Sequence, residues 1–193
     1  MKVAIIKYNA GNVLSVSHAL RRHGIEPLLT DETAEIIAAD KVIFPGVGEA
    51  STAMRYLQAR QLDQLIPKLQ QPVLGICLGL QLMCLASEEN DTRCMGIFPH
   101  HVRRFPPKQK VPHIGWNRIE NLNSPLFQNL QAEPVTYFVH SYYGELGKQS
   151  IAETDYIVRF SAALQKDNFC AVQFHPEKSG DVGAQILANF LNL

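Results

Sequence analysis

The sequence predicts an α/β fold in three layers, with a mostly parallel central sheet and added antiparallel strands in the second half of the chain. In the first half, short apolar runs alternate with segments of helical periodicity, as in strands joined by right-handed helical crossovers. After Asn90, strand-like segments are separated by Pro, Gly and Asn turns, which indicates antiparallel pairing.

The first half divides into short strands, each followed by a helical segment. A helix is expected from Val13 to His23, because its apolar residues fall on one face and Gly24 follows it. The expected strands are 3–6, 27–29, 42–44 and 73–76, and the further helices are 33–38, one or two segments ending at 69, and 80–85.

The second half adds strands and closes with a helix. The expected strands are 102–105, 116–119, 135–139, 156–160 and 170–174, with an exposed linker at 106–110. From Gly183 to Leu193 the apolar residues form one face of an amphipathic helix. With 193 residues and no internal repeat, the chain is expected to be one domain over 1–193.

Composition argues against several classes of partner. Eighteen basic and eighteen acidic side chains cancel, so no overall field attracts nucleic acid or an anionic membrane. We see no signal-peptide pattern and no apolar run of membrane-spanning length, so we expect a soluble, cytoplasmic protein. The four cysteines lack CxxC spacing and His100-His101 lacks further ligands, so we expect no metal, no cofactor and a solvated histidine pair.

Cys77 is a candidate nucleophile, because it lies in Gly75-Ile76-Cys77-Leu78-Gly79 between an expected strand and an expected helix. Glycines on both sides allow a sharp turn from which the central side chain projects. The partial positive charge at a helix amino terminus favours the thiolate form of such a cysteine. Most free cysteines are small buried hydrophobes, and the elbow alone leaves that alternative open.

A base for this nucleophile is suggested by Phe174-His175-Pro176-Glu177. Pro176 favours an extended conformation at His175, and in an extended segment Glu177 points to the same side as the imidazole. Together with Cys77, a histidine oriented by a carboxylate forms a triad for acyl transfer. The alternative is an ordinary exposed pair at a strand end.

Acyl transfer also needs donors for the developing oxyanion. The N–H of Leu78 follows the nucleophile directly and is the first candidate. Pro45-Gly46-Val47-Gly48 leaves an expected parallel strand at its carboxyl end, where its glycines allow backbone N–H groups to turn inward. A simple tight turn is the alternative for this loop.

These three motifs resemble those of class I glutamine amidotransferases, and the resemblance spans nearly the whole chain. Further stretches at 111–117, 137–142 and 175–180 are similar to the family of glutaminase subunits of imidazole glycerol phosphate synthase. The resemblance implies a flavodoxin-like, class I glutamine amidotransferase fold. It also implies hydrolysis of glutamine to glutamate and ammonia through a glutamyl thioester on Cys77, with His175 transferring protons and Glu177 orienting His175.

By the same resemblance, other residues bind the substrate or stabilise the oxyanion. The oxyanion hole is expected at Gly46, Val47 and Leu78. The glutamine-binding residues are expected to be Gly48, Gln81, Glu89, Ser141 and Tyr142. A carboxylate suits the ammonium group of glutamine, although Glu88-Glu89 is also consistent with a solvated helix end.

The family match further implies a partner, a cyclase subunit with a (β/α)8-barrel fold that forms a heterodimer with the chain and receives the ammonia. Residues expected to face it are Asn12, Trp116, Tyr137 and Lys178. Core packing is the alternative for Trp116.

We also expect that the Gly46-Val47 peptide must reorient before its N–H faces the oxyanion, because glycine-flanked loops turn at little cost.

The chain departs from the family pattern at Lys7 and Asn9, where Asp and Gly are frequent, and at Leu80 and Ile114, where Met is usual. The first pair alters the expected docking loop, and the second alters packing only.

Two other functions are considered. A glutaminase subunit of anthranilate or pyridoxal phosphate synthase is disfavoured by the stretches around Trp116 and Ser141. An inactive binding module is disfavoured by the intact triad.

Overall fold

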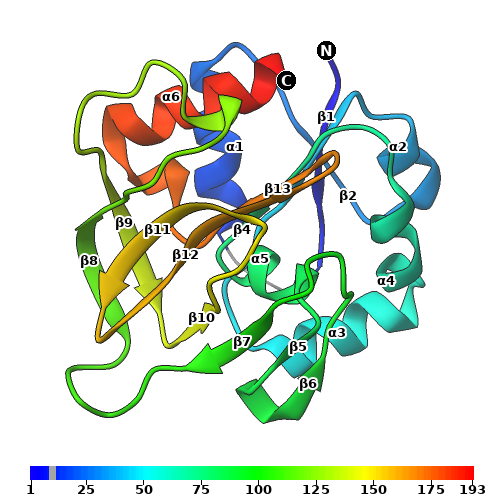
Figure 1. Cartoon of the computed structure of the whole chain (residues 1–193). Coiled ribbons are helices and arrows are strands. Elements are labelled where there is room, and N and C mark those ends of the chain that lie inside the picture. The colour runs from blue at the N-terminus through cyan, green and yellow to red at the C-terminus, as the bar shows by residue number, and fades with distance from the viewer. Residues whose placement is uncertain (9–11) are drawn as a thin grey trace.

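The computed structural model describes residues 1–8 and 12–193, so Asn9 lies outside the described residues. The largest sheet has the strand order β11-β12-β13-β4-β3-β1-β2. Its parallel strands are β1 (Val3–Ile6), β2 (Leu28–Thr30), β3 (Lys41–Phe44), β4 (Val73–Ile76) and β13 (Phe169–Val172). Read from β2, they follow the 2-1-3-4-5 order of flavodoxin-like sheets (Figure 1), which confirms the predicted fold class.

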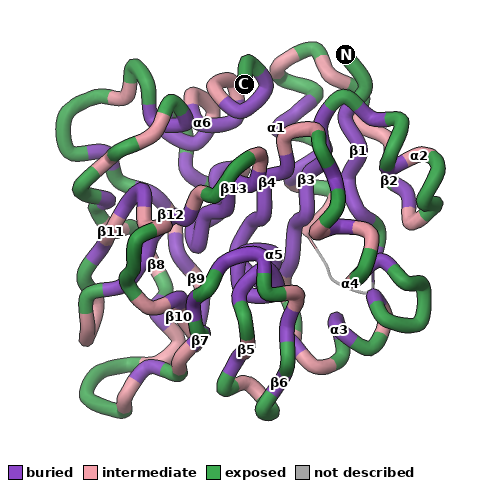
Figure 2. Tube along the Cα trace, turned by 45° about the vertical axis from the view of Figure 1, so that its right-hand side comes forward, coloured by how far each residue is buried: buried purple, intermediate pink, exposed green. Residues whose placement is uncertain are grey.

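Helices cover both faces of this sheet. Every residue of β1, β3, β4 and β13 is buried, as expected for strands covered on two sides (Figure 2). One face packs against α1 (Val13–Arg22) and α6 (Gly180–Asn192). The other packs against α2 (Thr33–Ile37), α3 (Ala50–Ala59), α4 (Leu62–Leu65) and α5 (Leu78–Met83).

Further strands, paired mostly antiparallel, extend the sheet and build two smaller ones. β11 (Ser150–Tyr156) and β12 (Val158–Lys166) continue the large sheet beyond β13. β8 (His113–Arg118) pairs with β9 (Val135–His140). The third sheet contains β5 (Ala86–Ser87), β6 (Thr92–Arg93), β7 (His101–Arg104) and β10 (Tyr142–Gly144). Short 3-10 helices span Ile66–Lys68, Glu89–Asp91, Pro125–Phe127 and Pro176–Lys178.

Three expectations for local structure were wrong. The strand predicted at 156–160 is interrupted by the hairpin turn between β11 and β12 at Ile157, whose φ is 63°, so Tyr156 ends one strand and residues 158–160 begin the next. Strand-forming residues on both sides of this one-residue turn conceal it in the sequence. α5 begins and ends two residues earlier than expected. His100 is buried and bonds to the carbonyl of Glu145 and the side chain of Gln149, so only His101 of that pair is solvated.

In the described part of the chain, no helix combines the length and apolar character needed to cross a bilayer. The parallel strands instead bring three loops together at their carboxyl ends. β3, β4 and β13 are neighbours, and the loops that follow them carry Gly46, Cys77 and His175 respectively. This edge is where open α/β sheets place ligands.

Candidate active site

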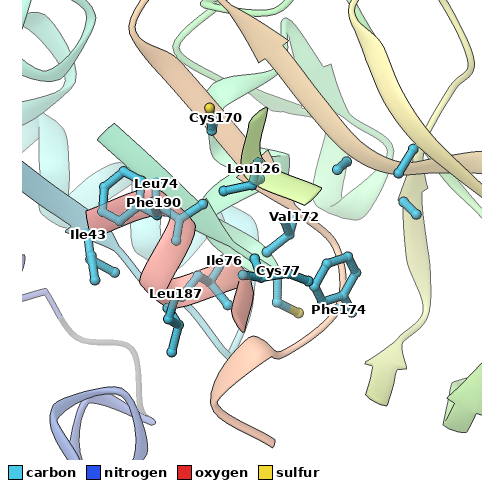
Figure 3. Close-up of a cluster of buried hydrophobic side chains, with 14 of the residues drawn as sticks. Ile43, Leu74, Ile76, Cys77, Leu126, Cys170, Val172, Phe174, Leu187 and Phe190 are labelled. Carbon is cyan, nitrogen blue, oxygen red and sulfur yellow. The ribbon is translucent and has the colours of Figure 1, made fainter. Parts of the chain in front are cut away.

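Cys77 occupies the sharp turn between β4 and α5 that the sequence predicted. Its φ of 53° and ψ of −106° are rare for a residue with a side chain, so the turn is strained. Gly79 is required here, because a Cβ on it would overlap the carbonyl oxygen of Phe44, and a Cβ on Gly75 would lie 2.6 Å from Met83 Sδ. Figure 3 shows Cys77 beside Ile76 and Phe174 at the edge of a buried apolar cluster.

His175 and Glu177 lie next to each other in the loop after β13. His175 Nδ1 is 2.8 Å from Glu177 Oε1, and the two side chains are 1% and 0% exposed, which rules out an ordinary exposed pair. Pro176–Lys178 form a 3-10 turn, so the carboxylate reaches the imidazole through that turn and not along an extended strand as expected. Asn12 Nδ2, at the start of α1, also donates to Glu177 Oε1.

The electrostatics of His175 depend on Cys77. Burial by itself lowers the pKa of His175, but the charge of the Cys77 thiolate and the hydrogen bond with Glu177 outweigh it and raise the pKa well above its usual value. His175 Nε2 is buried and has no hydrogen-bond partner among the described residues. An imidazolium is therefore favoured beside the sulfur at neutral pH, with one N–H left to serve a reacting group.

The loop after β3 is not arranged as an oxyanion hole. The Leu78 N–H donates to the Gly46 carbonyl at 3.2 Å. Because the N–H and C=O of a trans peptide point in opposite directions, the Val47 N–H faces away from Leu78. One expected donor is thus occupied by the loop itself, and the other is turned away.

A cavity of about 300 Å³ opens beside Cys77. The predicted residues that line it are Val47, Gly48, Cys77, Leu78, Gln81, Glu89, Ser141 and Tyr142. Pro112, Val139 and His140 also line it and were not predicted as site residues, although they lie in the stretches 111–117 and 137–142 that carried the resemblance. Glu89 is half-buried, and its Oε2 accepts the Ala50 N–H at 2.8 Å, whereas Glu88 is exposed. Burial raises the pKa of Glu89.

Two buried histidines support the cavity wall. His140 Nδ1 lies 2.7 Å from the carbonyl of Tyr142, which can only accept, so Nδ1 carries the proton. In the neutral ring His140 Nε2 is then an acceptor, and the N–H at His113 Nδ1 donates a hydrogen bond to it at 3.2 Å. Burial lowers the pKa of His113 to about 4 and that of His140 to about 3. Both rings are therefore neutral at pH 7.

This pair predicts that the protein loses stability in mild acid. Both pKa values are lower in the folded chain than the unfolded value of about 6.5, so the unfolded chain binds more protons as the pH falls. The contribution of each neutral histidine to the free energy of unfolding is fully present above about pH 6.5 and decreases towards pH 4. At pH 5 the loss is roughly 2 kcal/mol per histidine. Urea unfolding at pH 7, 6 and 5 measures the slope of the free energy of unfolding against pH.

His113→Leu should flatten the slope, because it removes one of the two buried rings that must be protonated. His101→Leu, which changes an exposed histidine, serves as the control and should leave the slope as in the wild type. Equal slopes in His113→Leu and wild type contradict this assignment.

Of the residues expected to face a partner, Trp116 and Lys178 are exposed, whereas Asn12 and Tyr137 are half-buried. On one side of the β8–β9 hairpin, Ile114 and Trp116 are 52% and 58% exposed, so Trp116 is not a core residue. The Tyr137 ring meets the Trp116 ring edge to face, with centroids 5.9 Å apart. Lys178 is exposed, and Asn12 lies at the amino terminus of α1.

The site has no obvious place for a metal, because among the described residues no group of three or more His, Cys, Asp or Glu side chains could hold one. The arrangement instead provides a strained cysteine, a buried His–Glu pair and a cavity with one carboxylate. Such a set is suited to nucleophilic attack on a carbonyl.

Comparison with known proteins gives consistent matches. A family model described as "Glutamine amidotransferase class-I" matches residues 4–193. The "Imidazole glycerol phosphate synthase subunit HisH" of Bacteroides fragilis (strain YCH46) is 57% identical, and that of Bacteroides thetaiotaomicron is 56% identical; each alignment covers 100% of both chains. A solved glutamine amidotransferase structure superposes with a TM-score of 0.78 at 18% identity, covering 98% of this chain and 97% of that one, a likeness of fold alone.

Proposed function

The chain belongs to the class I glutamine amidotransferase family, and from this premise we propose that it is the glutaminase subunit of an imidazole glycerol phosphate synthase in histidine biosynthesis. The observation that carries the proposal is that Cys77 lines a cavity of about 300 Å³ while the buried His175–Glu177 pair, which does not itself line the cavity, lies behind it and responds to the charge of Cys77. The names of relatives that align over the full chain narrow the family to this synthase and disfavour the alternative synthases.

In the proposed reaction, the Cys77 thiolate attacks the side-chain amide carbon of glutamine. His175 gives its Nε2 proton to the departing ammonia, and a glutamyl thioester remains on Cys77. The neutral His175 then takes a proton from water, which attacks the thioester and releases glutamate. Glu177 accepts the Nδ1–H of His175 and keeps Nε2 directed at the reacting atoms.

The cavity provides the groups that we assign to binding of the substrate. Glu89 is a half-buried carboxylate that suits the ammonium group of glutamine. Gly48, Gln81, Ser141 and Tyr142 line the remaining wall near Cys77 and are proposed to hold the rest of the amino acid. The cavity is large enough for one small amino acid and water.

We assign the oxyanion hole to the N–H groups of Leu78 and Val47, formed only after the Gly46-Val47 peptide turns over. Support comes from the hydrogen bond of Leu78 N–H to the Gly46 carbonyl, which a developing oxyanion must displace. The described state is therefore a resting one. Hydrolysis of glutamine would be slow until something outside this chain favours the turned peptide.

The proposed partner is a (β/α)8-barrel cyclase that takes up ammonia and forms imidazole glycerol phosphate and the aminoimidazole carboxamide ribonucleotide. The exposed apolar side of the β8–β9 hairpin is suited to docking. It connects directly to the site, because the Tyr137 carbonyl accepts the His175 N–H at 2.9 Å. A cytoplasmic location is part of the proposal, since the four free cysteines, Cys77 among them, need a reducing compartment.

The proposal is tested by incubating the chain with glutamine, alone and with a candidate cyclase and its ribonucleotide ligand, and measuring glutamate. Glutamate is expected in the presence of the liganded cyclase. An absence of glutamate under every partner condition would overturn the enzyme assignment and favour an inactive binding module.

Docking should be visible in the fluorescence of Trp116, the only tryptophan of the chain. The ring is 58% exposed, so burial against a partner should shift its emission to shorter wavelength. Titration with a tryptophan-free cyclase variant measures the shift. Trp116→Ala should weaken binding by about 2 kcal/mol, the scale of an aromatic anchor. Leu29→Ala, at an exposed leucine on β2, is the control; unchanged affinity in Trp116→Ala contradicts the assignment.

A further inference from the structure

Gln173 is a fully buried polar residue that the proposed mechanism does not use. It follows β13, its exposed fraction is 0%, and its side chain extends towards the nucleophile. Its Nε2 lies 3.6 Å from Cys77 Sγ, within hydrogen-bond distance for sulfur, and its Oε1 lies 3.2 Å from Gln81 Nε2. Burial of an amide is costly unless its groups are paired, so these contacts indicate a built arrangement.

The orientation of the Gln173 amide follows from its neighbours. The carbonyl of Tyr142 can only accept, so the Gln81 atom 2.9 Å from it is the amide nitrogen. This nitrogen also faces Gln173, and the Gln173 atom that meets it must therefore be the oxygen. The amide nitrogen of Gln173 is then left to face Cys77 Sγ. A donor at the sulfur is consequently fixed by a backbone carbonyl two side chains away.

We propose that Gln173 donates a hydrogen bond from Nε2 to the Cys77 thiolate and stabilises it, and that Gln81 holds the Gln173 amide in the donating orientation. The inference rests on the proposed role of Cys77 as nucleophile. Hydrogen bonds to a charged atom are stronger than those to a neutral one, so the contact favours the thiolate over the thiol.

The donor acts at both stages of the proposed reaction. When the thiolate attacks, its electron pair forms the C–S bond and the contact with Gln173 weakens. When water attacks the thioester carbonyl, the C–S bond breaks, the electron pair returns to sulfur and the contact is restored. Gln173 thus stabilises the sulfur as a leaving group in the second stage. Because Gln81 lines the cavity, the same hydrogen bonds link the proposed substrate site to the nucleophile.

Other titratable groups also act on Cys77 and must be separated from Gln173. His175 approaches from the loop after β13, with Glu177 behind it. Tyr8 is buried beyond the end of β1, and burial followed by the charge of Cys77 raises its pKa. His140 lies across the cavity on β9 and is neutral at pH 7. Substitution of Gln173 by an uncharged side chain leaves all of these in place.

The test is the rate of Cys77 alkylation by iodoacetamide as a function of pH, measured on the full chain by mass spectrometry. The other cysteines react little, because burial raises the pKa of Cys94 and of Cys170 to about 12 and that of Cys84 further. Gln173→Met keeps the side-chain length and removes the donor. We expect the midpoint of the alkylation profile to move up by about one pH unit.

Gln185→Met, on α6 with a single side-chain bond to Asn189, is the matched control and should keep the wild-type midpoint. Gln173→Leu is a second variant without the donor, used in case Gln173→Met does not fold. Thermal unfolding shows which of the two variants is folded. In the wild type, the side-chain amide proton signals of Gln173 should shift with pH at the alkylation midpoint. The proposal would be overturned by a wild-type alkylation midpoint in the folded variants. It would also be overturned if the Gln173 amide proton signals did not shift with pH at the alkylation midpoint. Alkylation needs no glutamine turnover, so failure of the glutaminase assay would be a separate result.

Discussion

Cys77→Ala is expected to abolish glutamine-dependent synthesis by the complex while leaving ammonia-dependent synthesis intact. In the proposed division of labour this chain only releases ammonia, and the thioester step has no substitute for the sulfur. Loss of the nucleophile of a triad enzyme lowers the rate by about 10⁶-fold. Product formation should therefore fall to background with glutamine and remain at the wild-type rate with an ammonium salt at alkaline pH.

Cys94→Ala is the matched control, because this cysteine is also buried but lies outside the cavity beside Cys77. It should support both reactions. Equal loss of glutamine-dependent and ammonia-dependent synthesis in Cys77→Ala, with the complex intact by gel filtration, contradicts the separation of the two activities.

Local chemistry explains why much of the fold and the elbow could be predicted. The strands beneath the site are continuous apolar runs with turns on either side, and a buried parallel strand needs little else. Gly79 marks the sharp turn because a Cβ there would overlap the carbonyl oxygen of Phe44, and Gly75 lies close against Met83. The resemblance to class I glutamine amidotransferases, confirmed by the family match, was carried by such short motifs.

Features that depend on contacts between residues far apart in the sequence could not be predicted in this way. Gln173 became informative only when the fold placed it against Cys77, although it directly precedes Phe174-His175 in the sequence. His140 and Pro112 reach the cavity because β8 pairs with β9, a pairing that no local pattern specifies. The hairpin turn at Ile157 was missed for the opposite reason, since strong strand propensity continues on both sides of it.

The second large effect expected is a difference in the rate of glutamate release between the free chain and the docked, liganded complex. In the described state the Leu78 N–H is occupied by the Gly46 carbonyl at 3.2 Å, and the Val47 N–H is turned away. Loss of one oxyanion donor costs about 10²- to 10³-fold in rate. We therefore expect glutamate release by the free chain to be slower by at least this factor than release by the complex with its ribonucleotide ligand bound.

Two variants at Val47 separate this explanation from a general effect of docking. Val47→Ala keeps the backbone N–H and should retain most of the stimulation, whereas Val47→Pro removes the N–H and should lose about 10²- to 10³-fold in the liganded complex. Steady-state glutamate release with saturating glutamine measures each rate. A free chain as fast as the liganded complex contradicts the resting-state assignment, because an occupied Leu78 N–H and a displaced Val47 N–H cannot stabilise an oxyanion. If the expected difference is found, the partner controls the donors for the oxyanion through the orientation of one peptide, that between Gly46 and Val47.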